Sequence, residues 1–328
     1  MWATRAEDLI RIRIVRAGLY APPTVQTAEE LAPRLGRSAD WIISRTGVER
    51  RHIAEEDMAQ MGAKAAQQVL GDAVPDLIVN ASLTPIQLIP DSSVFIQRAM
   101  GLQGIPSFSI HATCLSFMVG LHTSAALLHA GAYQRILLIS SEQGSVCRDE
   151  TEPESAALIG DGAAAALIER TPDGEASELL GFTMRTWPSG ANYTELRGCG
   201  TFRHPNHAHT VAKDNLFQMR GPRIYRMAYG QADSLLDDCF GQAGLQRDDV
   251  DLVIPHQASG PMLGVIPRFG FPEDKVVNII GEYGNCIAAS LPMALAHALQ
   301  TGRLQRGMTV LLYGTGAGLS MGATLLRY

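Results

Sequence analysis

Short apolar runs alternate with helical patterns along the whole sequence, and this alternation constrains the fold more than any other feature. Runs rich in Val, Ile and Leu are typical of strands buried on both faces of a sheet, and the intervening stretches repeat their apolar residues with the period of a helix. This order favours an α/β architecture in which mixed sheets are covered by helices. The segments expected to form strands are 12–17, 77–81, 108–112, 135–140, 180–186, 251–255, 275–279, 309–313 and 319–327.

Helices are expected between these strands. Thr27 and Ser38 each precede a helical pattern, where their side chains can cap the free backbone N–H groups of the first turn. The Gly-Asp-Gly sequence at 160–162 is expected to form a turn inside a hydrophobic stretch, and 187–215 is expected to be irregular. The expected helices are 27–35, 38–44, 58–70, 92–100, 114–130, 221–240, 261–269 and 287–301.

The same order of elements occurs twice along the chain, although no literal sequence repeat is present. A length of 328 residues is too great for one simple core and fits two similar halves. Thr171-Pro-Asp-Gly174 has the composition of a surface turn between them. We therefore expect one half at 1–175 and the other at 176–328.

Composition excludes several classes of protein. Hydrophobic residues make up 46% and charged residues 18%, which is typical of a globular chain, and the net charge of −6 disfavours binding to nucleic acid or an anionic membrane. No run approaches the roughly 20 apolar residues of a membrane span, and 1–16 mixes charged with apolar residues, unlike a signal peptide. The five cysteines are scattered without a CxxC pair, which disfavours disulfides or structural zinc and favours the reducing cytoplasm.

Cys114 is the first candidate for chemistry. It stands where an apolar strand is expected to end and a long helix to begin. Free amides and the helix dipole favour an anion at such a point, so the pKa of the thiol should fall and its nucleophilicity should rise. A buried structural cysteine is an equally good interpretation of this segment alone.

Three later segments add candidates that are individually weak. His256 directly follows an apolar strand, where open α/β sheets build ligand sites, but a core histidine has the same pattern. Asn285 precedes a helix rich in small residues and could be an ordinary N-cap. The glycines of 313–322 permit a tight turn, although the segment lacks the lysine of a phosphate loop and the position of a dinucleotide fingerprint.

In this order the segments resemble the thiolase superfamily, and most closely its ketoacyl-ACP synthase III branch, over nearly the whole chain. The resemblance implies an α/β fold of two similar halves, with stacked mixed sheets sandwiching and covered by helices in the order αβαβα. It also implies a homodimer. The motifs that carry it are 40–53, the Cys114 segment, Gly160-Asp-Gly-Ala-Ala-Ala-Ala-Leu167, Pro255-His-Gln-Ala258 and Tyr283-Gly-Asn285 with the following Ala-Ala-Ser-Leu-Pro.

The resemblance also implies a mechanism and a set of roles. Cys114 would take an acyl group from a thioester, and His256 and Asn285 would bind the carbonyl of a malonyl thioester that loses carbon dioxide and condenses with it. Backbone amides of Cys114, Ala317 and Gly318 would form the oxyanion hole. No metal or redox cofactor is implied, and acyl-CoA or acyl carrier protein would be the partner.

Trp41 and Arg45 match residues that hold the pantetheine arm in the family. A core aromatic side chain and a structural ion pair are alternative interpretations of these two positions. Two further positions depart from the family pattern. Many relatives carry an arginine shortly after the His-Gln-Ala motif and another before the Gly-Asp-Gly motif, whereas this chain has Ser259-Gly-Pro261 and Pro153-Glu154.

These departures favour a specialised pathway of fatty-acid or polyketide assembly over the housekeeping one. Another basic patch could come from arginines at 220, 223, 226 and 268.

Other functions remain open. One is transfer of the Cys114-bound acyl group to an alcohol or amine, and another is a non-catalytic partner subunit of a synthase. A branch that joins acyl chains without decarboxylation uses a glutamate that the matching stretch 82–90 lacks, while Glu142 could not be placed. The histidines of 199–209 fit no standard zinc spacing, so a loop that shapes the acyl pocket is the better interpretation.

Overall fold

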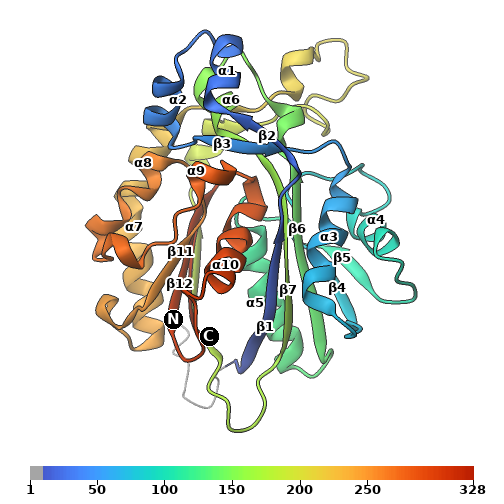
Figure 1. Ribbon diagram of the computed structural model, residues 1–328, viewed down its shortest axis with the longest axis vertical. Coiled ribbons are helices and arrows are strands. Elements are labelled where there is room, and N and C mark those ends of the chain that lie inside the picture. Colours follow the sequence, from blue (N-terminus) through green and yellow to red (C-terminus); the bar gives the residue numbers. More distant parts are fainter. Residues whose placement is uncertain (1–9) are drawn as a thin grey trace.

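Two mixed β-sheets stand next to each other, with helices between them and on both outer sides (Figure 1). The computed structural model describes residues 10–328, so residues 1–9, part of the stretch in which we expect no signal peptide, lie outside it. Within residues 10–328, no helix combines the length and the apolarity needed to cross a membrane.

The first sheet has the strand order β1-β7-β6-β4-β5. β4 runs parallel to β5 and β6, while β7 runs antiparallel to both β6 and β1, so the sheet is mixed as expected. β5 forms one edge. The strands are β1 (Ile12–Tyr20), β4 (Leu77–Asn80), β5 (Ser107–Ser109), β6 (Arg135–Gln143) and β7 (Asp161–Arg170).

The second sheet has the order β11-β12-β13-β8 and is also mixed. β11 is parallel to β12, and the other two pairs are antiparallel. A turn at 171–174, exposed from Pro172 onwards, joins β7 of the first sheet to β8 of the second, and the division at residue 175 stays our proposal. The strands are β8 (Glu178–Thr186), β11 (Leu252–Pro255), β12 (Thr309–Gly316) and β13 (Ser320–Arg327).

Helices complete the five layers that the family resemblance implies. α5 (Ser116–His129) and α10 (Ser290–Gln300) lie between the sheets, and one hydrophobic core joins them to strands of both. Both are apolar around most of their circumference, which is typical of a helix buried on all sides. α3 (Met58–Leu70) and α4 (Ser92–Ala99) cover the outer side of the first sheet, and α7 (Gly221–Ala243) covers that of the second.

Short elements gather at one end of the layers, at the top of Figure 1. The predicted caps are confirmed, because Thr27 accepts a hydrogen bond from the backbone of Glu30 and Ser38 accepts one from that of Trp41. The elements are α1 (Ala28–Leu35), α2 (Ala39–Thr46), α6 (Pro153–Leu158), α8 (Gly260–Leu263), α9 (Ile280–Tyr283), β2 (Thr24–Thr27) and β3 (Arg50–Ile53).

Three sequence predictions of secondary structure are wrong. Segment 160–162 is no turn, because β7 begins at Asp161, whose buried carboxylate accepts hydrogen bonds from the backbone of Ala54 and Ser145. Segment 261–269 divides into α8 and the 3₁₀ helix Ile266–Phe269. Segment 275–279 forms only an isolated bridge to β11, at Val276, and the side chain of Gln257 bonds the carbonyl of Val277 and the amide of Ile279.

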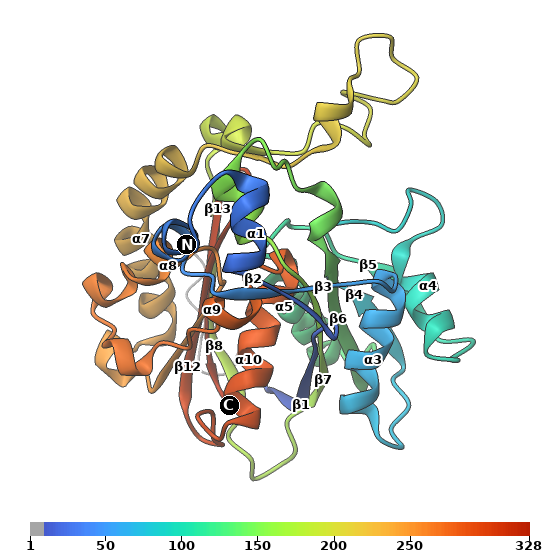
Figure 2. The same ribbon diagram turned by 45° about the horizontal axis from the view of Figure 1, so that its top comes forward.

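The irregular stretch after β8 leaves the body of the molecule and returns to it. Residues 196–217 project from the main mass (Figure 2). Where this segment departs and returns, β9 (Thr194–Glu195) pairs with β10 (Gln218–Met219) in a two-stranded ribbon. The base of the projecting segment is thereby fixed to the end of the molecule that carries the short elements.

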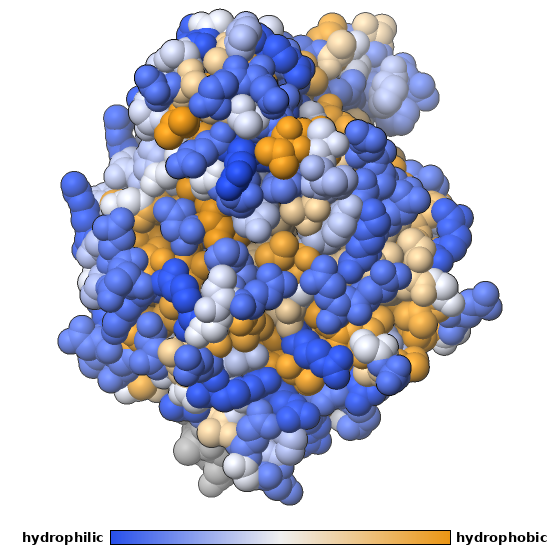
Figure 3. All heavy atoms as spheres, viewed as in Figure 1, coloured by the Kyte–Doolittle hydropathy of each residue, from blue (hydrophilic) through white to orange (hydrophobic). Residues whose placement is uncertain are grey.

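Most of the surface seen in Figure 3 is hydrophilic, and hydrophobic side chains reach it in scattered places and at the edge near α4. Large exposed hydrophobic side chains near this edge include Leu88 and Ile89, in the loop before α4, and Val94 and Phe108, on α4 and β5. Since β5 is also an edge strand, this side of the molecule leaves both backbone groups and apolar side chains unpaired.

Candidate active site

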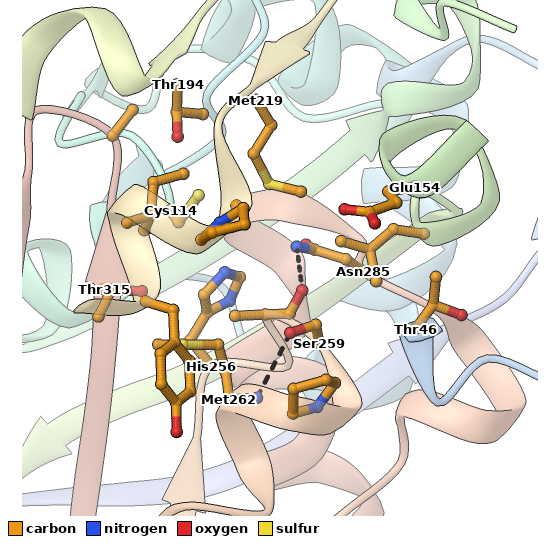
Figure 4. A pocket seen from close by; sticks show the side chains of 18 of the residues that line it. Thr46, Cys114, Glu154, Thr194, Met219, His256, Ser259, Met262, Asn285 and Thr315 are labelled. Carbon is orange, nitrogen blue, oxygen red and sulfur yellow. Dashed lines mark hydrogen bonds between the residues drawn. The ribbon is translucent and has the colours of Figure 1, made fainter. Parts of the chain in front are cut away.

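A cavity of about 260 Å³ opens at the end of the layers that carries the short elements, and residues from both halves line it. Cys114, His256 and Asn285 all lie in its wall and point into the same space (Figure 4). The rest of the wall is mainly apolar, with Leu158, Phe217, Met219, Pro222, Ile224, Tyr225, Pro261 and Met262. The three candidate residues, distant in sequence, are therefore brought together.

The backbone holds Cys114 in a tight bend just before α5. Thr113 has a φ of 53°, a left-handed conformation that is uncommon for a β-branched residue. Ser116 supports the bend, because its hydroxyl accepts a hydrogen bond from the amide of Ala112 (3.0 Å) and donates one to the carbonyl of Thr113 (2.6 Å). Gly316 packs closely on the bend, since a Cβ there would lie 2.5 Å from Oγ1 of Thr113.

The predicted lowering of the Cys114 pKa is wrong. Burial, followed by the charge of Glu142, raises the pKa of this thiol to about 12. Backbone amides of Ala317 and of Cys114 itself act in the opposite direction but do not compensate. α5 begins at Ser116, two residues after Cys114, so the sulfur does not lie at the first turn of the helix, where the helix dipole would favour a thiolate. The resting site therefore holds a neutral thiol.

The amides near the sulfur partly match the expected oxyanion hole. Those of Cys114 and Ala317 are directed at the sulfur and could also donate to an oxyanion formed there. Gly318 comes directly after Ala317, in the turn that follows β12. It is not part of the cavity wall, whereas Gly316 and Ala317 are. Two of the three expected backbone donors are thus in position.

His256 follows β11 and is buried. Burial lowers the pKa of its imidazole to about 4, so the ring is neutral at physiological pH. Its Nδ1 atom is buried and has no hydrogen-bond partner within residues 10–328. The neighbouring Gln257 fixes the segment, since its amide nitrogen donates to the carbonyls of Pro255 (2.9 Å) and Val277 (3.0 Å).

Asn285 is held by three hydrogen bonds in the cavity wall. Its Nδ2 donates to the carbonyl of Ala258 (3.1 Å), and its Oδ1 accepts from the amide of Ile287 (2.8 Å) and the hydroxyl of Ser290 (3.3 Å). This arrangement fixes the orientation of the carboxamide and leaves its second N–H free of these bonds. The amide group can therefore serve as a neutral donor toward the cavity.

Glu142 is a buried carboxylate near the site whose position the sequence did not reveal. It lies at the end of β6 and accepts hydrogen bonds from the amides of Leu83 and Thr84 and from the Thr84 hydroxyl (2.8 Å). Burial raises its pKa to about 7. The run Ser-Ser-Glu at the carboxyl end of a buried strand was the available signal for this residue.

The two residues predicted to hold a pantetheine arm have different positions. Arg45 lines the mouth of the cavity, where its guanidinium is paired with Glu154, a residue whose place in the wall the sequence did not indicate. Trp41 is not part of the wall. Its ring is half-buried, with the guanidinium of Arg37 lying 5.1 Å from the ring centroid.

The histidine-rich segment contributes to the cavity only through its ends. The rings of His204, His207 and His209 lie close together on the projecting loop, with centroids 5.8 and 5.3 Å apart. No group of three or more ligating side chains in the described part of the chain could hold a metal. Thr194, just before the projecting residues, and Phe217, the last of them, line the cavity.

Comparison with protein families gives two matches. Residues 108–188, which include Cys114, match the family described as 3-oxoacyl-[acyl-carrier-protein (ACP)] synthase III. Residues 240–328, which include His256 and Asn285, match the family described as the C-terminal part of the same synthase. The two matches cover the three residues that meet in the cavity.

Individual relatives match over nearly their full length. The chain is 34% identical to a β-ketoacyl-[acyl-carrier-protein] synthase III of Chelativorans sp., covering 98% of this chain and 100% of that one, and 30% identical to one of Koribacter versatilis, covering 97% and 98%. The crystal structure of the 3-oxoacyl-[acyl-carrier-protein] synthase III of Aquifex aeolicus superposes with a TM-score of 0.88 at 30% identity, covering 97% and 100%. The expected thiolase-like fold is confirmed, and the chain belongs to the 3-oxoacyl-[acyl-carrier-protein] synthase III family of condensing enzymes.

Proposed function

We propose that this protein condenses an acyl group held on Cys114 with a malonyl-type thioester, releasing carbon dioxide and a 3-oxoacyl thioester. The observation that supports the proposal most strongly is the meeting of Cys114, His256 and Asn285 in one largely apolar cavity. A thiol, an imidazole and a carboxamide supply a nucleophile and two neutral hydrogen-bond donors, which is the set that this reaction needs.

The first step loads the enzyme. The Cys114 sulfur attacks the carbonyl carbon of an acyl thioester, a new C–S bond forms, and the thiol of CoA or of the carrier leaves. Since the Cys114 thiol and the His256 imidazole are both neutral at rest, the proton leaves the Cys114 sulfur during the attack and ends on the sulfur of the departing CoA or carrier thiol. The amides of Cys114 and Ala317 then face the oxyanion of the tetrahedral intermediate.

The second step makes the carbon–carbon bond. His256 and Asn285 donate hydrogen bonds to the thioester carbonyl of the malonyl unit, whose C–CO₂ bond breaks to leave an enolate. The enolate attacks the acyl carbonyl on Cys114, the C–S bond breaks, and the Cys114 thiolate that leaves takes a proton from solvent water. Donors that are fixed before the charge develops stabilise it without reorganisation, and Asn285 is fixed in this way.

Neither step changes an oxidation state or needs a Lewis acid, so we propose that the enzyme requires no metal or redox cofactor. The substrates are thioesters of CoA or of acyl carrier protein. All five cysteines are free, which supports activity in a reducing compartment such as the cytoplasm. We also propose a homodimer joined through the edge at β5.

A specialised pathway, which the two missing arginines favoured, finds no support among the relatives compared above. Each of them has the name of the synthase III itself. We therefore infer that the absence of these arginines affects how the substrate is bound. It does not indicate another pathway. Transfer of the acyl group to an alcohol or amine remains the main alternative function, and the retained Asn285 argues against it.

A test of the proposal separates the two steps. Incubation with a panel of acyl-CoA and acyl-carrier thioesters, followed by intact-mass measurement, should show one acyl adduct that is absent from Cys114→Ala. Carbon dioxide release from malonyl thioester should fall at least a hundredfold in His256→Ala and Asn285→Ala, while both variants still form the adduct.

Failure of the wild-type protein to form an adduct with any donor would overturn the proposal. Adduct formation followed by transfer to an alcohol or amine, with no carbon dioxide released, would establish the alternative.

A further inference from the structure

An ion pair between two half-exposed side chains, Arg45 and Glu154, forms the part of the cavity wall that we call the mouth. Arg45, on α2, directs both Nε (3.2 Å) and Nη2 (2.5 Å) to one carboxylate oxygen of Glu154, on α6. The other oxygen of Glu154 faces the start of α7, because a Cβ on Gly221 would lie 4.0 Å from it. The carboxylate of Glu154 therefore lies between Arg45 on α2 and the start of α7.

These two side chains differ from the rest of the wall. Among the described residues that line the cavity, Arg45 and Glu154 are the only ones with a formal charge at neutral pH, because the pKa of His256 is about 4. Both are half-exposed, with 55% and 43% of the side-chain surface accessible. An ion pair with this exposure contributes little free energy and can open and close readily.

We propose that Glu154 is a specificity-determining residue that competes with the phosphate group of the incoming thioester for Arg45. The inference rests on the proposed function, in which a pantetheine thioester reaches Cys114 through this mouth. A guanidinium binds a phosphate in the same bidentate manner as a carboxylate. When the arm enters, Arg45 exchanges the Glu154 carboxylate for the phosphate, and Glu154 remains beside it as a like charge.

This exchange makes a specific prediction about substrates. Glu154 opposes every thioester that places a phosphate at the mouth, whether the phosphate belongs to CoA or to a carrier-bound arm. It does not oppose a thioester of pantetheine or N-acetylcysteamine, which carries no phosphate. The ratio of the KM for a phosphate-bearing donor to the KM for a phosphate-free donor therefore reports the competition directly.

The chain offers a closely matched control. Glu150, four residues before Glu154, is paired with Arg34, and the accessible fractions are 41% and 55%. Neither residue lines the cavity. Glu150→Gln thus removes a carboxylate of similar exposure and partner from the same region without affecting the mouth.

The experiment compares acyl-CoA with the N-acetylcysteamine thioester of the same acyl group in both variants. Glu154→Gln should lower the ratio of KM values about three- to fivefold, the factor expected for removing an exposed ion-pair competitor, and Glu150→Gln should leave the ratio at the wild-type value. Against an Arg45→Gln background, Glu154→Gln should lower the ratio by a smaller factor than in the wild-type background, because the competition for Arg45 is gone and only the repulsion between Glu154 and the phosphate remains.

An unchanged ratio of KM values in Glu154→Gln, including the case in which both KM values change by the same factor, would overturn the inference while leaving the proposed function intact. Failure of the wild-type protein to acylate Cys114 with either donor would instead overturn the proposed function.

Discussion

Burial shifts the pKa values of the two reacting side chains in opposite directions, and both shifts favour the neutral form. It raises the pKa of the Cys114 thiol and lowers that of the His256 imidazole, so both are neutral in the resting site. A neutral thiol is protected from oxidation and from unwanted electrophiles until a thioester fills the cavity. The sequence alone suggested an activated thiolate, because position near a helix start was visible and the depth of burial was not.

Glu142 should make the reactivity of Cys114 depend on pH. Its pKa of about 7 means that the carboxyl is neutral below pH 7 and charged above it, and the charge opposes formation of the thiolate. Glu142→Gln should therefore leave alkylation of Cys114 by iodoacetamide unchanged at pH 6 and accelerate it about three- to tenfold at pH 8.5. Equal acceleration at both pH values would exclude titration of Glu142 as the cause.

Gly316 should tolerate no side chain, because its space is taken by Thr113 in the bend before Cys114. A Cβ at 2.5 Å from Oγ1 forces either strand β12 or the bend to move. We expect Gly316→Ala to lower the free energy of unfolding by about 1–3 kcal/mol in urea denaturation and to reduce acylation at least tenfold.

Gly230, within α7, has no neighbouring atom within 4 Å of such a Cβ and provides the control. Gly230→Ala should raise the free energy of unfolding by about 0.5–1 kcal/mol without affecting acylation, because alanine is the better helix former. A Gly316→Ala protein that acylates as fast as the wild type would show that the bend does not depend on this contact.

At the scale of elements, α7 carries a row of arginines beside the mouth of the cavity. Arg220, Arg223 and Arg226 recur every third residue, which places them on one side of the helix start, and all three are exposed. Within residues 10–328 none of them forms a salt bridge under 4 Å. Gly221, Pro222, Ile224 and Tyr225, interleaved with them, line the cavity.

We expect an acidic carrier protein to dock on this row and pass its arm into the mouth. The double variant Arg223→Glu and Arg226→Glu should raise the KM for a carrier-bound thioester about tenfold or more at low salt, with a smaller effect at high salt. Arg170→Glu, an exposed charge reversal at the far end of β7, is the control. An equal KM for the double variant and the control would exclude this docking face.

The elements that the sequence predicted best are those in which the periodic pattern of apolar residues extends over many residues. α3 occupies the predicted residues, and β1, β6 and β8 extend beyond them by a few. Segment 275–279 was predicted as a strand from its apolar residues, but it pairs with β11 only at an isolated bridge, and the side chain of Gln257 bonds the backbone beyond it. A long-range bond from a side chain leaves no periodic signal, so local patterns could not predict it.

At the scale of the whole molecule, the edge at β5 offers a surface for a second copy of the chain. The edge strand and the exposed Leu88, Ile89, Val94 and Phe108 combine unpaired backbone with apolar side chains. We expect sedimentation equilibrium to give the mass of a dimer, and Phe108→Asp to shift the equilibrium towards the monomer by at least tenfold in dissociation constant. A wild-type monomer at micromolar concentration would contradict the proposal.

The layered fold and the meeting of Cys114, His256 and Asn285 could be predicted from motifs in register, since the family resemblance supplied the order of elements. The wall of the cavity could not. Phe217 and Met219 reach it after a long excursion of the chain, and Glu154 enters it through a contact with Arg45 that spans more than a hundred residues of sequence. Such contacts depend on the packing of irregular segments, which no local pattern describes.

The turn at 171–174 joins a half that supplies the nucleophile to a half that supplies both donors, and Asp173 within it is fully accessible. Cutting the chain there would yield two polypeptides, neither of which has a complete set of reacting groups. Activity would then return only when the two fragments reassociate. Co-expressed fragments could therefore serve as a complementation reporter, in which the rate of product formation measures how well one sheet packs against the other.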